Sequence, residues 1–200
     1  MIIIGLTGGI GTGKSTVSNY LKEKGCLILD ADELSRQMTE KGQPALGEIA
    51  LNFGDHLIDE SGNLDRQALG NIVFNDKNKL DLLQSIITSK VVEFINDRIY
   101  KLKAEEYKGI VVIDAPLLFE CGMENISDEN WLVVADLESR LKRVAQRDGL
   151  SKAQILSRIK NQKPQEEKEE LSHVILDNSN TLEALYNQID SNLERINNEF

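Results

Sequence analysis

The fold is decided near the start of the chain, where residues 2–16 read IIIGLTGGIGTGKST. The first five of these residues are apolar or glycine, which is typical of a short buried strand. Gly8 and Gly13 then bracket four residues and precede Lys14 and Ser15, so the segment matches the phosphate-loop pattern G-x-x-x-x-G-K-[ST] between a strand and a helix. The stretch therefore predicts a site for the phosphates of a nucleotide.

The residue types of this loop suit that chemistry. Glycines let successive backbone N–H groups face one concavity, and the following helix directs its positive end to the same point. Lys14 is expected to reach the β- and γ-phosphates, and Ser15 to hold Mg²⁺ through its hydroxyl. A turn that binds nothing would not need the Lys-Ser pair. The residues predicted to bind ATP here are Gly9, Ile10, Gly11, Thr12, Gly13, Lys14, Ser15 and Thr16.

Length and composition limit the class of protein. The chain has 200 residues, which is the length of one domain with sizeable insertions. Because 40% of the residues are hydrophobic, the chain can form a core and is not expected to be disordered. Its net charge of −10 argues against a general nucleic-acid or membrane-surface binder, because affinity for a polyanion comes largely from neutralising its phosphates. Small molecules are the expected partners, and any anion site must be local.

Cysteine and histidine usage predicts no metal cluster. Cys26 and Cys121 lie far apart in the sequence and outside any C-x-x-C spacing, so both thiols are expected to be reduced. His56 and His173 are isolated as well. The chain starts without a basic leader or a long apolar segment. A cytoplasmic location is expected, with the chain a monomer or a weak homo-oligomer.

Five short apolar runs predict a parallel sheet covered by helices on both faces, in an α/β fold of the P-loop NTPase kind. The runs are Ile2–Leu6, Cys26–Leu29, Ile110–Ile113, Trp131–Ala135 and Val174–Leu176. Acids follow the second, third and fourth runs at Asp30, Asp32, Asp114 and Asp136, and ligands of open α/β sheets bind beyond the carboxyl ends of the strands. These acids are candidates to face one crevice, whereas Trp131 is expected to pack in the core.

The remaining segments divide the chain further. Between the second and third runs, apolar residues recur at helical spacing over 46–53 and 80–102, which predicts a helical insertion over about 33–107. The core is then residues 1–32, 108–137 and 172–200, ending in an amphipathic helix. We expect the stripes of the insertion to be core packing, and the insertion to hold a second substrate.

A basic block marks a lid over about 138–171. From Arg140 to Lys163 the chain carries eight basic side chains against one acid, Asp148, which is typical of a segment that gathers phosphates. Arg143 and Arg147 are four residues apart and would share a helix face. Residues 165–170 turn acidic, and there a solvated helix is expected.

Together these parts predict a phosphoryl-transfer enzyme, with two alternatives. One is a regulatory GTPase, but no N-K-x-D guanine motif follows a late strand, since Asn75–Asn78 falls in the insertion and out of pattern. The other is a P-loop kinase that acts on another nucleoside or nucleotide acceptor, which the same loop and lid would serve equally.

The chain resembles dephospho-coenzyme A kinases over nearly its whole length, up to about residue 190. The phosphate loop alone is shared by many NTPases, but its combination with an Asp-Ala-Asp and a Pro-Leu-Leu-Phe-Glu motif is far more specific. The matching segments are residues 6–16, 30–32, 53–54, 62–66, 73–74, 114–120, 147–149 and 177–178.

The resemblance implies ATP-dependent phosphorylation of the ribose 3′-hydroxyl of dephospho-coenzyme A. It gives catalytic roles to Asp32, Lys14 and Arg143, with Asp32 as the base that orients the hydroxyl and Arg143 as the lid arginine on the transferring phosphoryl. It further implies substrate contacts by Thr7, Arg66 and Leu117, ATP contacts by Arg147 and Asn178, and Asp114 acting on Mg²⁺ through water. From the residues alone, Asp32 and Asp65 would each also suit a helix N-cap.

Three positions depart from the family's pattern. The family usually has His-Pro where this chain has Thr88-Ser89, Ala-Asp where it has Ser172-His173, and Gln where it has Arg140. The first departure concerns the acceptor side, and the others concern the lid and the nucleotide-base side. None touches the phosphate loop, Asp32 or Arg143.

Overall fold

The computed structural model describes residues 1–199, which form two compact units. One unit joins Met1–Leu29 to the segment from Lys108 onward, and the other is Asp30–Tyr107. Each unit has its own secondary structure and is considered separately below.

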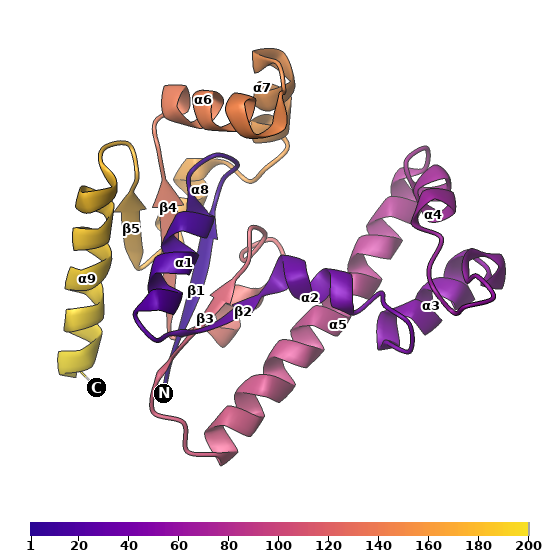
Figure 1. The fold of residues 1–200 in the computed structure, drawn as a ribbon, viewed down its shortest axis with the longest axis horizontal. Helices are drawn as coiled ribbons and strands as arrows, with labels where there is room; N and C mark the ends of the chain where they lie inside the picture. The colour runs from indigo at the N-terminus through magenta and orange to yellow at the C-terminus, as the bar shows by residue number, and fades with distance from the viewer. Residues whose placement is uncertain (200) are drawn as a thin grey trace. The chain divides into compact units, whose positions relative to one another are not determined.

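The first unit is built on a five-stranded sheet whose strand order is β2-β3-β1-β4-β5 (Figure 1). The strands are β1 Ile2–Gly8, β2 Leu27–Asp30, β3 Ile110–Asp114, β4 Glu129–Val134 and β5 Val174–Asp177. β1 pairs in parallel with both β3 and β4, and β4 pairs in parallel with β5. The central strand is therefore the one that leads into the phosphate loop, as expected for an α/β fold that binds its ligand at the carboxyl edge.

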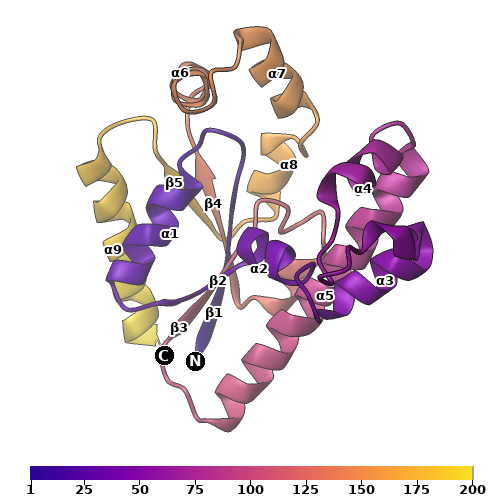
Figure 2. The ribbon, with the colours of Figure 1, turned by 45° about the vertical axis from the view of Figure 1, so that its right-hand side comes forward.

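Helices cover both faces of this sheet. α1 (Lys14–Glu23) and α9 (Leu182–Glu199) pack side by side on one face, whereas α8 (Gln165–Glu170) lies on the opposite side (Figure 2). α6 (Leu137–Asp148) and α7 (Lys152–Lys160) lie beyond the edge that carries the phosphate loop (Figure 1). The predicted strands, their parallel pairing and the closing helix are confirmed.

The core between the sheet and the α1/α9 layer consists of aliphatic side chains around one tryptophan. Trp131 on β4 is fully buried, as predicted, and belongs to one buried cluster with Leu6, Leu21 and Ile189. Cys26 belongs to the same cluster, and desolvation raises the pKa of its thiol to about 11. Both cysteines are free, in agreement with the expected reduced thiols.

The second unit is helical. Its helices are α2 Ala31–Gln37, α3 Pro44–Phe53, α4 Arg66–Val73 and α5 Lys77–Ala104. The inner stripe of α5 is buried at Val91, Ile95 and Ile99, so the expected core packing is confirmed. An ion pair of 2.8 Å between Lys90 Nζ and Glu48 Oε1 joins α5 to α3.

No helix in the described part of the chain is both long and apolar enough to cross a membrane.

A bidentate ion pair between β4 and α9 gives a stability prediction. Glu129 accepts hydrogen bonds of 2.8 Å from both terminal nitrogens of Arg195 and one of 2.9 Å from Trp131 Nε1. These donors, with Arg195 foremost, hold the pKa of Glu129 below its usual value. Glu129→Gln is expected to lower the free energy of unfolding by about 1–3 kcal/mol near neutral pH.

The same variant has a pH signature. A depressed pKa stabilises the fold above the carboxyl's unfolded value of about 4.3, and this stabilisation is lost as the pH falls through the folded value. The stability gap between wild type and Glu129→Gln should therefore narrow on acidification, as measured by urea unfolding. Glu194→Gln, an exposed change on the same helix, is the control; equal effects of the two variants would contradict the role of the pair.

Candidate active site

The phosphate loop runs from the end of β1 into α1. Gly11 and Gly13 have φ values of 80° and 91°, a left-handed conformation that favours glycine. Gly13 is the N-cap of α1, and no side chain caps the helix, so its first N–H groups remain available to an anion. The loop closes on itself because Thr12 donates from its hydroxyl and from its backbone N–H to the Gly9 carbonyl, at 2.9 and 3.2 Å.

A buried lysine–aspartate pair lies next to this loop. β3 pairs with β1 so that Asp114 stands opposite Leu6, and Lys14 Nζ donates to Asp114 Oδ1. The exposed fractions of the two side chains are only 16% and 5%, so water screens the pair little. The structure thus brings together two of the residues that the sequence predicted for the site.

Polar side chains hold the loop from outside. At the Ile10 peptide, Arg140 Nε donates to the carbonyl and Gln162 Oε1 accepts from the N–H, both at 2.9 Å. At Thr12, the carbonyl accepts from Asn178 Nδ2 at 2.8 Å, and Arg143 Nη2 donates to the Asn178 carbonyl at 2.8 Å. The loop conformation is therefore fixed before any ligand arrives.

Other predicted residues of this unit lie in different surroundings. Thr7 is fully buried at the end of β1, where its hydroxyl donates to the Pro116 carbonyl at 3.2 Å. Leu117 is 48% exposed just beyond β3. Arg147 is exposed on α6 and donates to Asp148 at 2.7 and 3.0 Å, which raises the pKa of the arginine. Ser15 is exposed in the first turn of α1.

Asp32 and Arg66 belong to the helical unit. Asp32 is exposed in the first turn of α2, but Asp30 is the N-cap, accepting from the Glu33 N–H at 2.9 Å. The alternative in which Asp32 caps the helix is therefore wrong, because β2 ends at Asp30 and the helix begins one residue later. Arg66 Nη2 donates to Thr39 Oγ1 at 2.8 Å.

Asp65, in contrast, is a helix cap as anticipated: its carboxylate accepts from the N–H groups of Gln67 and Ala68 at the start of α4.

The acidic segment contains a second correction. α8 was expected to be a solvated helix, yet Lys168 in its middle is only 2% exposed and lies 3.0 Å from Glu120 Oε1 in an ion pair. In the sequence, its four acidic neighbours gave no indication that this lysine is buried. Gln162, which holds the Ile10 peptide, also went unpredicted, since no pattern singles out a glutamine 152 positions away from its partner.

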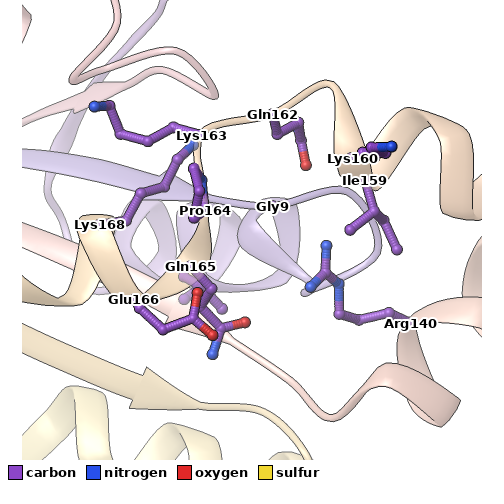
Figure 3. A pocket seen from close by; sticks show the side chains of 11 residues that line it. Gly9, Arg140, Ile159, Lys160, Gln162, Lys163, Pro164, Gln165, Glu166 and Lys168 are labelled. Carbon is purple, nitrogen blue, oxygen red and sulfur yellow. The ribbon is translucent and has the colours of Figure 1, made fainter.

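A pocket of about 420 Å³ borders the loop at Gly9 (Figure 3). Figure 3 shows Arg140 and Gln162 pointing toward this loop from opposite sides. The pocket is further lined by the end of α7, the segment up to Pro164, and α8.

The loop geometry predicts unequal effects for two glycine substitutions. A Cβ on Gly13 would overlap Asn178 Nδ2, whereas one on Gly25, with nearly the same φ of 90°, would meet no described atom within 4 Å. Gly25→Ala should cost about 1–2 kcal/mol of stability and leave ADP affinity unchanged. Gly13→Ala should also weaken ADP binding by about 10-fold or more, because Asn178 and the Thr12 carbonyl must move.

Thermal unfolding of both variants with and without ADP would measure this difference. Equal ADP-dependent shifts in Gly13→Ala and Gly25→Ala would contradict the assigned role of the loop geometry.

The phosphate loop follows the central strand of a parallel sheet and leads into a helix whose N-terminus has no side-chain cap. With the lysine–aspartate pair beside it, this arrangement defines a P-loop kinase of α/β fold. A family model described as dephospho-CoA kinase matches residues 2–184. The chain belongs to the dephospho-CoA kinase family, whose reaction is the last step of coenzyme A synthesis.

Individual relatives agree with the family model. The chain is 42% identical over 193 residues to a dephospho-CoA kinase of Carboxydothermus hydrogenoformans, covering 96% of this chain and 93% of the relative. Among solved structures, a Thermus thermophilus protein has a TM-score of 0.79 and 35% identity, with 97% of both chains covered. A dephospho-CoA kinase from Campylobacter jejuni has a TM-score of 0.73 and 26% identity, covering 97% of this chain and 96% of that one.

Proposed function

We propose that this protein transfers the γ-phosphoryl of ATP to the ribose 3′-hydroxyl of dephospho-coenzyme A, giving ADP and coenzyme A. The observation that carries the proposal is the pre-formed phosphate loop with Lys14 paired to Asp114, in a chain of this family. The acceptor oxygen bonds to the γ-phosphorus, the bond to the β-phosphate oxygen breaks, and the hydroxyl proton leaves the acceptor.

ATP is held by its phosphates in this account. The N–H groups over Gly9–Thr16 and the Lys14 ammonium surround the phosphate chain, with Lys14 exchanging Asp114 for the β- and γ-phosphates. Asn178 and Arg143 already contact the loop at Thr12, which supports their placement beside the nucleotide. Arg143 stabilises charge on the transferring phosphoryl, and Arg147 supports it from the next turn of α6.

Mg²⁺ is proposed to accompany ATP. The exposed Ser15 hydroxyl and the nearby Asp114 carboxylate are oxygen donors of the kind that Mg²⁺ prefers, Asp114 acting through water. Among the side chains that the structure describes, no cluster of three or more acidic, cysteine or histidine residues could hold a metal. In this proposal the ion is bound largely by phosphate oxygens and water, as is usual for Mg²⁺ carried by a nucleotide. When bound, Mg²⁺ neutralises charge on the β- and γ-phosphates.

The acceptor is assigned to Asp32, Arg66, Leu117 and Thr7. Asp32 is exposed and is not occupied as a helix cap, so its carboxylate is available to orient the 3′-hydroxyl and accept its proton. The buried Thr7 would act by shaping the loop through Pro116. The segment 33–107 is proposed as the substrate-binding insertion and 138–171 as the lid that keeps water from the phosphoryl group.

We further propose that the protein acts in the cytoplasm, as a monomer or a weak homo-oligomer. The two free cysteines support a reducing compartment. Light scattering over a range of protein concentrations tests the oligomeric state.

The function is tested by an acceptor panel. ATP consumption is measured with Mg²⁺ and dephospho-coenzyme A, adenosine, AMP or no acceptor. We expect ADP and coenzyme A to form in equal amounts with dephospho-coenzyme A, and no turnover with the other acceptors. Preferential turnover of adenosine or AMP would reject the acceptor while leaving the ATP site intact. Preferential hydrolysis of GTP without any acceptor would reject the kinase mechanism in favour of a GTPase.

A further inference from the structure

The pocket beside Gly9 has an unusual charge for a protein of net charge −10. Basic side chains line it at Arg140, Lys160, Lys163 and Lys168, against one acid, Glu166. Two of these cations are buried: the exposed fractions of Arg140 and Lys168 are 7% and 2%. Buried cations require a partner, since removing a charge from water is costly.

The ammonium of Lys168 is incompletely satisfied. It can donate three hydrogen bonds, yet its contacts within the described chain are limited to the ion pair with Glu120, and no hydrogen bond forms. The wall of the pocket therefore contains a buried positive charge that is balanced by a single carboxylate.

Arg140 is similarly incomplete at its far end. Nε donates to the Ile10 carbonyl, but the two terminal nitrogens make no hydrogen bond to the described residues. Nη2 lies only 2.8 Å from where a Cβ on Gly9 would stand, so the fork lies against the phosphate loop. Burial lowers the pKa of this guanidinium, as expected for a cation that lacks an anionic partner.

We propose that this pocket binds a diphosphate group, and that the 5′-diphosphate of the acceptor dephospho-coenzyme A is its source. This inference rests on the proposed function, because that acceptor carries its diphosphate close to the ribose that is phosphorylated. The phosphates of ATP are assigned to the N–H groups of the loop and the N-terminus of α1. The four cations that line this pocket would therefore provide a second phosphate site next to the loop.

The lysines at the rim provide the test, because the buried pair could be needed for folding. Lys160 is exposed, and Lys163 makes only a 3.2 Å contact with Glu167 on the surface. The double variant Lys160→Gln/Lys163→Gln is compared with Lys142→Gln/Lys152→Gln, which removes two exposed lysines of the same segment outside the pocket. Thermal unfolding verifies that both variants are folded.

The expected result is a KM for dephospho-coenzyme A raised about 10-fold or more in the rim variant, as for the loss of charged hydrogen bonds, with an unchanged KM for ATP. Adenosine, which lacks the diphosphate, should bind the two double variants equally. An unchanged KM for dephospho-coenzyme A, or a change in the KM for ATP alone, would overturn the proposal.

Inorganic pyrophosphate distinguishes the acceptor from a free anion. With saturating Mg²⁺ and ADP, it should compete with dephospho-coenzyme A and bind more weakly to the rim variant. Pyrophosphate binding that depends on the rim lysines but does not compete with the acceptor would reject the acceptor as the source. Wild-type turnover is measured first, so that failure of the proposed function, with no coenzyme A formed, is seen separately from failure of the pocket.

Discussion

Lys14→Ala is expected to lower turnover about 10³-fold and to weaken ATP binding, because the ammonium is the charge assigned to the β- and γ-phosphates. The structure supports a large effect. Lys14 is poorly exposed and already pairs with the carboxylate of Asp114. Water therefore has little access to the position of the ammonium and could not substitute for its charge. Steady-state kinetics and ATP titration measure the two consequences separately.

The control for this variant lies on the same helix. Lys22→Ala removes an exposed lysine from the last turn of α1 and should leave both quantities unchanged. Because Lys14→Ala leaves Asp114 buried without its lysine, its thermal unfolding is recorded as well. A folded Lys14→Ala enzyme with normal turnover would remove the phosphate loop from the mechanism.

Asp32→Asn should reduce turnover by about 10²-fold or more while ATP affinity stays nearly intact, the effect of losing a general base. Asparagine keeps the shape of the side chain, and Asp30 rather than Asp32 caps α2, so the substitution should not disturb the helix. Stopped or coupled assays at saturating substrate give turnover, and ADP titration gives nucleotide affinity.

Glu33→Gln is the matched control, since it removes the neighbouring exposed charge from the same helix turn. If both variants lose activity equally, the effect is one of local charge. If Asp32→Asn retains normal turnover, Asp32 has no part in proton transfer.

Most of the fold could be predicted because parallel strands covered on both faces read as uninterrupted apolar runs. Each of the five predicted runs is a strand in the structure. The short helix α4 was not predicted from an apolar stripe, since over eight residues a helical period is hard to tell from a loop; only its capping residue Asp65 indicated it.

The site residues that belong to one local motif could be predicted from the sequence. The contacts between residues far apart in the sequence could not. Lys14 and Ser15 follow from spacing alone, and Asp114 from its place after a strand. The Gln162 contact with Ile10 and the burial of Lys168 depend on how α7 and α8 return to the sheet, which no local pattern encodes. The helix cap was placed at Asp32 instead of Asp30 because helix boundaries are uncertain by a residue or two.

The most direct measurement is the position of the new phosphate. Dephospho-coenzyme A, ATP and Mg²⁺ are incubated with the enzyme, and the product is analysed by mass spectrometry and ³¹P NMR, with Lys14→Ala as the blank. The account predicts one added phosphate, a monoester on the ribose 3′-oxygen, formed in step with ADP. Phosphate on any other oxygen, or ADP formed with inorganic phosphate and an unchanged acceptor, would contradict it.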